Sequence, residues 1–354
     1  MKTVQRTRGA LVALGLCLTL ALAACGSNGN GGGSGGHHKT VVGYSIATGG
    51  QPILNKAAEA FVATGKHYGW DVKTLDAQLD AGKQAQDIDQ FVAQGVDAIV
   101  FIAAGSNEAI LPSIKRAKKA GVKVLGLSAV LDPKGDVAPL DANLDGGGMY
   151  NGSDQLAKLA AERTRGKGNA LGVGLGIPVA FLQIQVEQYK KRLASYAPDV
   201  KWIDTVENPT DDITGAEHVV SEALTAHRRD VQTVLAYNDS SAVGAAVALK
   251  NAGVKDVFVA GVNGDSDAAE AVADGRVTAT IDLTPWRQGM MAAAMVKGLL
   301  AGDHVPKWIS VPVELYTKKN VGNRLDWDKA ISQIKSGKLT CKTGGCPAEI
   351  TDLP

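Results

Sequence analysis

The chain is poor in aromatic residues and in cysteine, and it has no excess of basic charge. Phe, Trp and Tyr make up 5% of its 354 residues, so its cores must rest on Ala, Val, Leu and Ile. Lysine and arginine number 37, against 36 aspartates and glutamates, and this balance lacks the positive surplus typical of nucleic-acid binding. We therefore expect a globular protein without a nucleic-acid partner.

Signatures of catalysis and of metal binding are also missing. The sequence has no H-E-x-x-H, no P-loop and no G-x-G-x-x-G, and no nucleophile stands beside a histidine after an expected strand. Gly32–Gly36 matches G-x-S-x-G, but no strand precedes it and no helix follows. Asn263–Asp274 resembles a calcium loop, yet Ala268 stands where the sharp turn needs glycine. We predict a protein that is not an enzyme and has no metal or cofactor.

One hydrophobic run is present, at the N-terminus. A basic stretch at residues 2–8 precedes a mostly apolar one at residues 10–24, which is shorter than the roughly 20 residues of a membrane span and typical of a secretory signal. The end of the run, Leu22-Ala23-Ala24-Cys25, resembles the lipobox of bacterial lipoproteins, in which the signal is cut before a cysteine that then carries lipid. We predict a signal peptide over 1–24 and lipidation at Cys25; an ordinary signal peptide with an incidental cysteine is the alternative.

A glycine-rich segment follows the expected lipidation site. Residues 26–36 hold seven glycines and bury nothing on ordering, so we predict a flexible tether over 25–39. Once Cys17 has left with the signal, only Cys341 and Cys346 remain beyond Cys25. Two thiols around "KTGG" can close a tight turn as a disulfide in an oxidising compartment. Metal binding is the alternative, but C-x4-C is a poor zinc spacing and no histidine is near.

From Thr40 onward, short β-branched runs alternate with alanine-rich stretches of helical spacing. The expected strands cover residues 40–46, 71–75, 97–103, 122–127, 169–175, 200–206, 233–237, 257–262 and 277–283. The expected helices cover residues 52–68, 81–94, 107–120, 149–165, 186–196, 212–226, 240–252, 266–274 and 285–300. Such alternation indicates parallel sheets with right-handed crossovers. We predict an α/β protein with two doubly wound lobes, whose ligand site lies beyond the carboxyl ends of the strands.

The loops at those strand ends carry a family resemblance. The segments are "QPIL", "DANLDGGGMYNG", "YND" before a Ser-Ser-Ala-Val-Gly helix, "GVNGD" and "DGRVTATIDLTPWRQG". Together and in order they resemble the ribose-binding branch of the type I periplasmic sugar-binding proteins, the solute receptors of ABC importers, over about Thr40–Tyr316. Lactose-repressor-type regulators share this fold but start with a DNA-binding helix-turn-helix, and the signal and tether take that place here.

The resemblance implies that the chain crosses three times between the lobes and that these crossings form a hinge. Lobe one is expected over 40–141 plus 284–313, and lobe two over 142–283 plus the tail 314–354. The crossings would lie near Asp141–Ala142, Leu283–Thr284 and Val313–Glu314.

The resemblance also places the ligand contacts. They fall on Gln51, Ile53, Leu54, Ser128, Ala129, Gln185, Asn238, Asn263 and Leu283, with Thr210 at a stacking position. A gap near Pro178 makes Phe181 and Gln183 rivals of Gln185. Trp286 could stack on a ring, or could simply be core, as Ile53 and Leu54 could be. Asp239 could be a helix N-cap, and Asn263 could only shape a turn.

The family's charged contacts are mostly replaced at these positions. Where the family has two Asp and two Arg, this chain has Ser128, Ala129, Gln185 and Asn263. Charged groups make the stronger hydrogen bonds that hold several vicinal hydroxyls. The pocket therefore suits a small neutral ligand, a sugar or a polyol-like compound with an apolar face, and ribose is expected to bind poorly.

These observations predict an extracytoplasmic, lipid-anchored solute-binding protein at the outer face of the cell membrane. It would act as a monomer, capture its ligand by lobe closure and deliver it to the permease of an ABC importer. The alternative is a surface receptor that reports the ligand to a sensor kinase without transport, because both roles need the same closure. A hydrolase on this fold is a third possibility, and it would need turnover from a site with no visible nucleophile.

Overall fold

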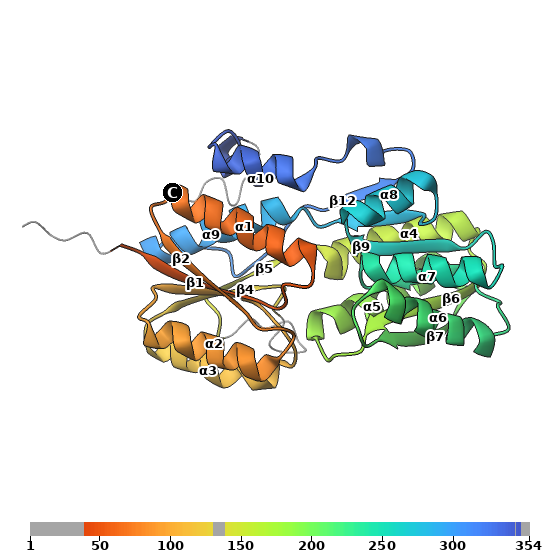
Figure 1. The fold of residues 1–354 in the computed structure, drawn as a ribbon, viewed down its shortest axis with the longest axis horizontal. Coiled ribbons are helices and arrows are strands. Elements are labelled where there is room, and N and C mark those ends of the chain that lie inside the picture. Colours follow the sequence, from red (N-terminus) through yellow and green to blue (C-terminus); the bar gives the residue numbers. More distant parts are fainter. Residues whose placement is uncertain (1–38, 130–138, 344, 348–354) are drawn as a thin grey trace, which may run out of the picture. The chain divides into compact units, whose positions relative to one another are not determined.

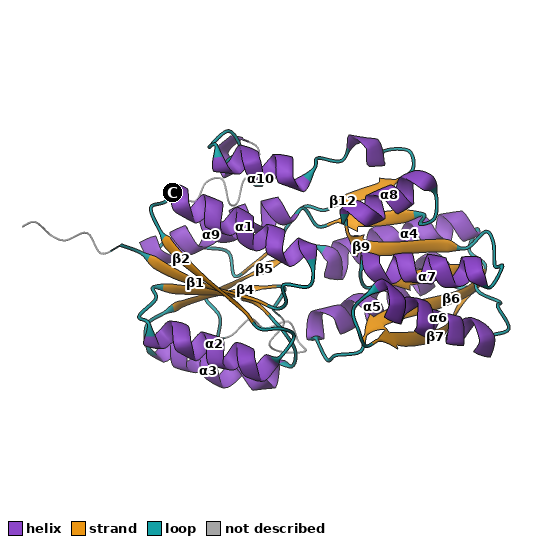
Figure 2. Cartoon of the chain, viewed as in Figure 1, coloured by secondary structure: helices purple, strands orange, loops and turns teal. Residues whose placement is uncertain are grey.

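The computed structural model describes residues 39–129, 139–343 and 345–347. The predicted signal peptide, the lipidation site Cys25 and nearly all of the tether lie outside these residues. The described part holds two six-stranded sheets, each flanked by helices (Figures 1 and 2). The predicted fold class, α/β with two doubly wound and mostly parallel sheets, is confirmed.

The first sheet has the order β11-β5-β4-β3-β1-β2, and all of its strand pairs are parallel. Its strands are β1 (Val41–Ile46), β2 (Asp71–Asp76), β3 (Ala98–Ile102), β4 (Lys123–Leu127), β5 (Ala142–Asp145) and β11 (Trp308–Ser310). Its helices are α1 (Pro52–His67), α2 (Ala81–Ala93), α3 (Asn107–Lys119) and α9 (Pro285–Ala301). We call these elements lobe one.

The alternation of side chains along β3 shows how helices cover both faces of this sheet. Ala98, Val100 and Ile102 point to the core that includes Phe61 of α1 and Met295 of α9. Ile99 and Phe101 point to the opposite core, which is filled from α2 and α3. A strand that is buried on both faces reads as a continuous apolar run, and "AIVFI" does so for this reason.

The second sheet has the order β12-β10-β9-β8-β6-β7, and only β12 runs antiparallel to its neighbour. Its strands are β6 (Gly168–Leu175), β7 (Val200–Asn208), β8 (Thr233–Ala236), β9 (Phe258–Asn263), β10 (Ala279–Asp282) and β12 (Glu314–Thr317). Its helices are α4 (Ser153–Thr164), α5 (Ala180–Tyr196), α6 (Ile213–Ala226), α7 (Asp239–Asn251) and α8 (Ser266–Asp274). We call these elements lobe two.

The first crossing between the lobes differs from the predicted one. Residues Ala142–Asp145 form β5, which pairs with β4 and β11 of the first sheet, so the chain leaves lobe one after Asp145 and not at Asp141–Ala142. The polar side chains of "ANLD" hid this strand from the sequence pattern. Their buried side-chain oxygens accept hydrogen bonds: Asn143 Oδ1 accepts from the Ala129 amide at 2.8 Å, and Asp145 Oδ2 accepts from the Ser310 hydroxyl at 2.8 Å.

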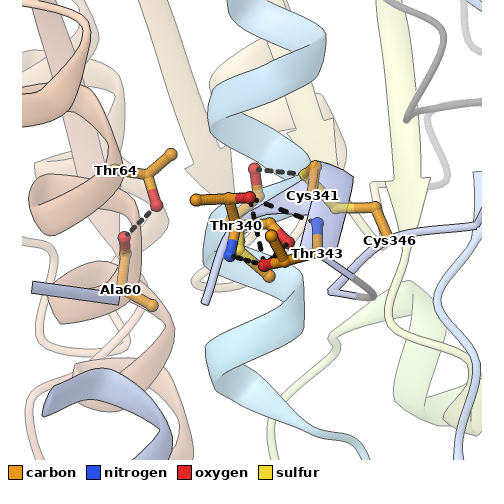
Figure 3. Close-up of a disulfide and its surroundings, with 7 residues drawn as sticks. Ala60, Thr64, Thr340, Cys341, Thr343 and Cys346 are labelled. Atoms are coloured by element: carbon orange, nitrogen blue, oxygen red, sulfur yellow. Dashed lines mark hydrogen bonds between the residues drawn. A yellow bond between two sulfur atoms is a disulfide. The ribbon is translucent and has the colours of Figure 1, made fainter. Parts of the chain in front are cut away.

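The short helix η2 (Val321–Asn323) still packs on α8 of lobe two, but beyond it the prediction that the C-terminal tail belongs to lobe two is wrong. Helix α10 (Trp327–Lys335) packs on α1 and α9 of lobe one. Its apolar face, Trp327, Ala330, Ile331 and Ile334, has helical spacing and is buried. Cys341 and Cys346 follow α10 and form a disulfide beside α9, where Figure 3 shows it next to the hydrogen-bonded turn of Thr340 and Thr343. The tail therefore returns to the lobe in which the described chain begins.

Candidate functional site

A cavity of about 100 Å³ lies at the carboxyl ends of the strands, between residues of the two lobes. One water needs roughly 10–15 Å³ in such a space, so the cavity takes about seven to ten waters, the size of a small ligand. Lobe one lines it with Ala47, Thr48, Gln51, Ile53, Leu54, Leu79, Ile102, Ala103 and Ser128. Lobe two lines it with Leu175, Val179, Phe181, Leu182, Gln185, Asp211, Tyr237, Asn238, Val262 and Asn263, and Gly146, Leu283 and Gln288 lie near the crossings. We call this space the interlobe cavity.

A carboxylate stands at the centre of its polar wall. Asp211 lies in the loop between β7 and α6, and its Oδ1 accepts from Asn238 Nδ2 at 2.8 Å and from the Tyr237 hydroxyl. Its Oδ2 accepts from Gln51 Nε2 of lobe one at 2.8 Å, and the same amide nitrogen lies 3.1 Å from the Asp211 carbonyl oxygen. Gln51 and Asp211 thus join the two lobes across the cavity.

Burial raises the pKa of Asp211, and the hydrogen bonds from Tyr237, Gln51 and Asn238 oppose that rise by favouring the charged form. Burial and the nearby Asp211 charge raise the pKa of the Tyr237 hydroxyl, which therefore stays a donor. Among the described residues that line the cavity, Asp211 alone has a charged side chain. The wall is therefore weakly acidic, although the sequence indicated a neutral one.

Asn238 has two roles at the start of α7. Its Oδ1 accepts from the Ser241 amide at 2.9 Å and caps the helix, while its Nδ2 holds Asp211. The N-cap role considered for Asp239 therefore belongs to its neighbour. Asp239 is buried instead, and its carboxylate accepts from the amides of Gly264 and Asp265 at 2.7 and 3.0 Å.

Gln185 and Phe181 both face the interlobe cavity, because α5 begins at Ala180 and not at Val186 as predicted. One turn of helix puts residues four apart on the same face. Gln185 Nε2 donates to the Tyr189 hydroxyl at 2.9 Å and to the Tyr237 carbonyl at 2.8 Å. The Gln185 amide therefore holds the backbone of Tyr237, the residue before Asn238. Phe181 adds apolar surface to the cavity.

Four non-glycine residues of the lining have positive φ angles. They are Leu79 (57°), Ser128 (49°), Asp211 (54°) and Asn263 (139°), in a backbone region that side chains other than glycine rarely adopt. Such strain gathers at binding sites, where the surrounding structure holds it in place. The Ser128 hydroxyl accepts from the Gly146 amide at 2.9 Å, and the Asn263 side chain opposes the rise in the pKa of the buried Asp265 carboxyl.

The apolar wall contains the two predicted residues of α1. Ile53 is 5% exposed and Leu54 is half-buried, and both line the cavity. Trp286 does not: it is buried with Met290 of α9 and Trp327 of α10, where it takes the core position considered for it. Ala129, Gln183 and Thr210 are also outside the lining. We therefore omit Trp286 from the proposed ligand contacts.

Sequence reasoning missed Asp211, Tyr237, Leu79 and Gln288. "NPTDDITG" after β7 offers two adjacent carboxylates, of which Asp212 is the N-cap of α6, with its Oδ1 2.7 Å from the Gly215 amide. A second acidic residue without a capping role, next to a strand end, was the available signal for Asp211. Leu79 and Gln288 gave none, because each reaches the cavity through long-range packing.

Two further observations concern the described part of the chain as a whole. Within residues 39–129, 139–343 and 345–347, no three His, Cys, Asp or Glu side chains are grouped so as to hold a metal ion. In the same residues no helix combines the length and the apolarity that a membrane crossing requires.

The model of the periplasmic binding protein domain family matches residues 42–304, and the chain belongs to this family. It is a type I solute-binding protein of the kind found in sugar ABC transporters.

Named relatives and solved structures match most of the chain. The chain is 29% identical to the ribose import binding protein of Bacillus subtilis over 285 residues, which cover 80% of this chain and 90% of that one. It is 27% identical to the xylitol-binding protein of Mycolicibacterium smegmatis over 250 residues, 69% of this chain and 68% of the relative. A periplasmic solute-binding protein of Actinobacillus succinogenes with bound D-allose superposes with a TM-score of 0.72 at 26% identity, covering 81% of this chain and all of the other. One from Agrobacterium vitis with bound allitol gives 0.73 at 25% identity, covering 80% and 97%.

Proposed function

We propose that this protein captures a small neutral sugar or polyol in the interlobe cavity and delivers it to the membrane permease of an ABC importer. The single observation that carries the proposal is the cavity itself, which is lined from both lobes at the strand ends and is of small-ligand size. The ligands named for relatives, ribose, xylitol, D-allose and allitol, belong to one chemical class. The contacts would come from Gln51, Ile53, Leu54, Ser128, Phe181, Gln185, Asn238 and Asn263, joined by Asp211.

The composition of the wall indicates which members of this class fit. Ile53, Leu54 and Phe181 offer an apolar surface, while Gln51, Asp211 and Asn263 offer polar groups. No arginine or lysine lines the cavity among the described residues, so a ligand held by several vicinal hydroxyls lacks the cationic half of a charged clamp. Ribose is therefore a weaker ligand in this proposal than a reduced or deoxygenated analogue.

Capture requires that the ligand bind the closed form better than the open one. Gln51 and Asp211 belong to different lobes and are hydrogen-bonded to each other at the cavity, so a ligand beside this pair contacts both lobes only after closure. This difference in affinity shifts the population toward the closed form, which a permease can then recognise.

The test is calorimetric titration of the purified protein with ribose, xylitol, allitol, D-allose and D-apiose. We expect micromolar or tighter binding of at least one of them, with ribose weaker than the best. Absence of heat with every compound, or ribose as the tightest ligand, would contradict the proposal on function or on specificity, respectively.

The location of the protein is a second part of the proposal. The lipobox-like segment ending at Cys25 and the glycine-rich residues after it support a lipid anchor at the outer face of the membrane, and we propose that the anchored protein acts as a monomer. Changing Cys25 to Ser should move the protein from the membrane fraction to the soluble one and abolish incorporation of labelled fatty acid. A C25S protein that stays in the detergent phase refutes the anchor without affecting ligand binding.

A further inference from the structure

We infer that Gln51 Oε1 and Asp211 Oδ2 form a pair of hydrogen-bond acceptors that selects the ligand by two adjacent donors, a vicinal diol, and rejects anionic ligands. This inference rests on the proposed function, because it names the part of the ligand that this site recognises. Asp211 is then the specificity-determining residue, and Gln51 is its partner from the opposite lobe.

Unused acceptor capacity is found at Asp211. Each carboxylate oxygen can accept about two hydrogen bonds. Oδ1 has two donors, the Asn238 amide and the Tyr237 hydroxyl, and is filled. Oδ2 has one, Gln51 Nε2 at 2.8 Å, so one direction stays open on the oxygen that faces lobe one.

The second acceptor is Gln51 Oε1, which is buried and has no hydrogen-bond partner. The Gln51 residue is 9% exposed and lines the interlobe cavity. A buried polar atom without a partner costs free energy, and a ligand hydroxyl in the cavity would remove that cost.

The amide of Gln51 cannot turn over to hide this oxygen. Its nitrogen lies 3.1 Å from the Asp211 carbonyl oxygen and 2.8 Å from Asp211 Oδ2, and both of these atoms only accept. An amide oxygen in that place would face two acceptors. The chemistry of Asp211 therefore fixes the orientation of the Gln51 side chain and leaves its oxygen as an acceptor.

Two neighbouring acceptors require two neighbouring donors. Adjacent hydroxyls of a polyol or sugar supply them, and each hydrogen bond to the carboxylate is charge-assisted. A carboxylate or phosphate group brings negative charge to Asp211, and the described lining has no cation to offset it. The site therefore accepts polyols and excludes the corresponding sugar acids.

The acceptor pair is also tied to closure. Gln51 precedes α1 of lobe one, and Asp211 precedes α6 of lobe two, 160 residues along the chain. The two acceptors are neighbours only when the lobes meet, so the diol is recognised by the closed form.

The experiment compares two substitutions with a matched control, by calorimetry with xylitol, allitol and D-allose. Asp211→Asn keeps the shape of the side chain and replaces an acceptor by a donor. Asp212→Asn removes the same charge one residue away, outside the cavity lining, and asparagine caps α6 equally well. We expect D211N to weaken binding of the best of the three compounds at least tenfold and D212N to change it less than twofold.

A second variant guards against misfolding of D211N. Gln51 makes no side-chain capping bond to α1, so Gln51→Leu removes both its donor and its acceptor without loss of a helix cap. We expect Q51L to weaken binding at least tenfold, and the wild-type protein to bind xylitol but not xylonate.

The outcomes separate the two proposals. If D211N and Q51L both bind with wild-type affinity, or if the wild type binds xylitol and xylonate equally well, the inference of an acceptor pair is wrong and the proposed function is unaffected. No binding of any sugar or polyol by the wild type overturns the proposed function and the acceptor pair together.

Discussion

The backbone of Gly289 in α9 lies directly against the carbonyl group of Ala57 in α1. A Cβ atom added to Gly289 would lie 2.2 Å from the Ala57 oxygen and 2.6 Å from the Phe61 nitrogen. Neither backbone atom can move without shifting a helix. This contact packs α9, which follows the second crossing, closely against α1, the helix that begins at the interlobe cavity.

We expect Gly289→Ala to destabilise the protein by about 2 kcal/mol or more, because overpacking a close helix contact forces the backbone apart. Gly322→Ala is the control, since no atom lies within 4 Å of the site of its added Cβ. Urea unfolding of both variants measures the difference, and equal midpoints would refute this account of the α1–α9 contact.

Two substitutions separate the two roles of Asn238, the cap of α7 and the hydrogen bond to Asp211. Serine caps a helix about as well as asparagine but cannot reach Asp211, so Asn238→Ser should keep the melting temperature within a degree or two and weaken polyol binding about tenfold. Asn238→Ala loses the cap as well and should cost about 1 kcal/mol of stability. Melting and calorimetry are measured side by side, and N238S with wild-type affinity would contradict the role of Nδ2.

Replacing Gln51 by Glu gives a prediction on pH. The new carboxyl group would face Asp211 Oδ2, where the glutamine amide now donates at 2.8 Å. Two adjacent carboxylates repel each other when both are ionised. The pair therefore takes up its first proton with a pKa above that of Asp211 in the wild type, which burial already raises. We expect Q51E to bind polyols poorly at pH 8 and to recover as the pH falls toward 5, when one proton bridges the pair. Q51L should show no recovery, and a flat profile for Q51E would argue against the contact.

A group of buried carboxyls makes the folded state sensitive to pH. Burial raises the pKa of Asp265, and the neighbouring Asp239 charge raises it further. Burial also raises the pKa of Asp282 to about 6, against a partly compensating Arg324. The folded protein holds these protons more tightly than the unfolded chain, so stability is lost as the pH rises and regained as it falls toward about 4.

Asp265→Asn should therefore raise the melting temperature at pH 8 more than at pH 5, because the variant has no charge to bury. Asp267→Asn, on the exposed side of the same helix α8, removes the same charge and serves as the control. Calorimetric melting from pH 5 to 8 gives the slopes. If the melting temperature changes equally with pH in the wild type and in D265N, Asp265 does not contribute to the pH dependence of stability.

The sequence predicted those elements whose structure depends on neighbouring residues, such as helical spacing of apolar side chains or a continuous apolar run. The helix over 52–67 and the strand "AIVFI" follow from spacing and from burial on both faces, and the amides at strand ends identify much of the cavity wall. Strand β5 was missed because its stability comes from two partner strands, one of them more than 160 residues away, and not from β-branched side chains. The first turn of α5 was missed because Phe181 and Leu182 face the cavity and so break the core pattern.

The charge of the site was misjudged for a similar reason. Family positions gave neutral residues, and the carboxylate came from Asp211, beside a position where stacking was expected. Its place depends on a left-handed backbone at Asp211 and on three side-chain donors from two distant segments, Gln51 from one and Tyr237 and Asn238 from the other. A repeating sequence pattern cannot predict contacts between residues that lie so far apart in the chain.

The return of the tail to lobe one bears on the order in which the protein can fold as it is made. Strand β11, helix α9 and helix α10 complete the first sheet and its cover, and they are all synthesised after the second sheet except β12. The N-terminal lobe therefore stays unfinished, with an open sheet edge and bare apolar helices, until about residue 335 has left the ribosome. Lobe two has nearly all of its strands together by residue 282. The second half of the chain can thus become native first, against the direction of synthesis.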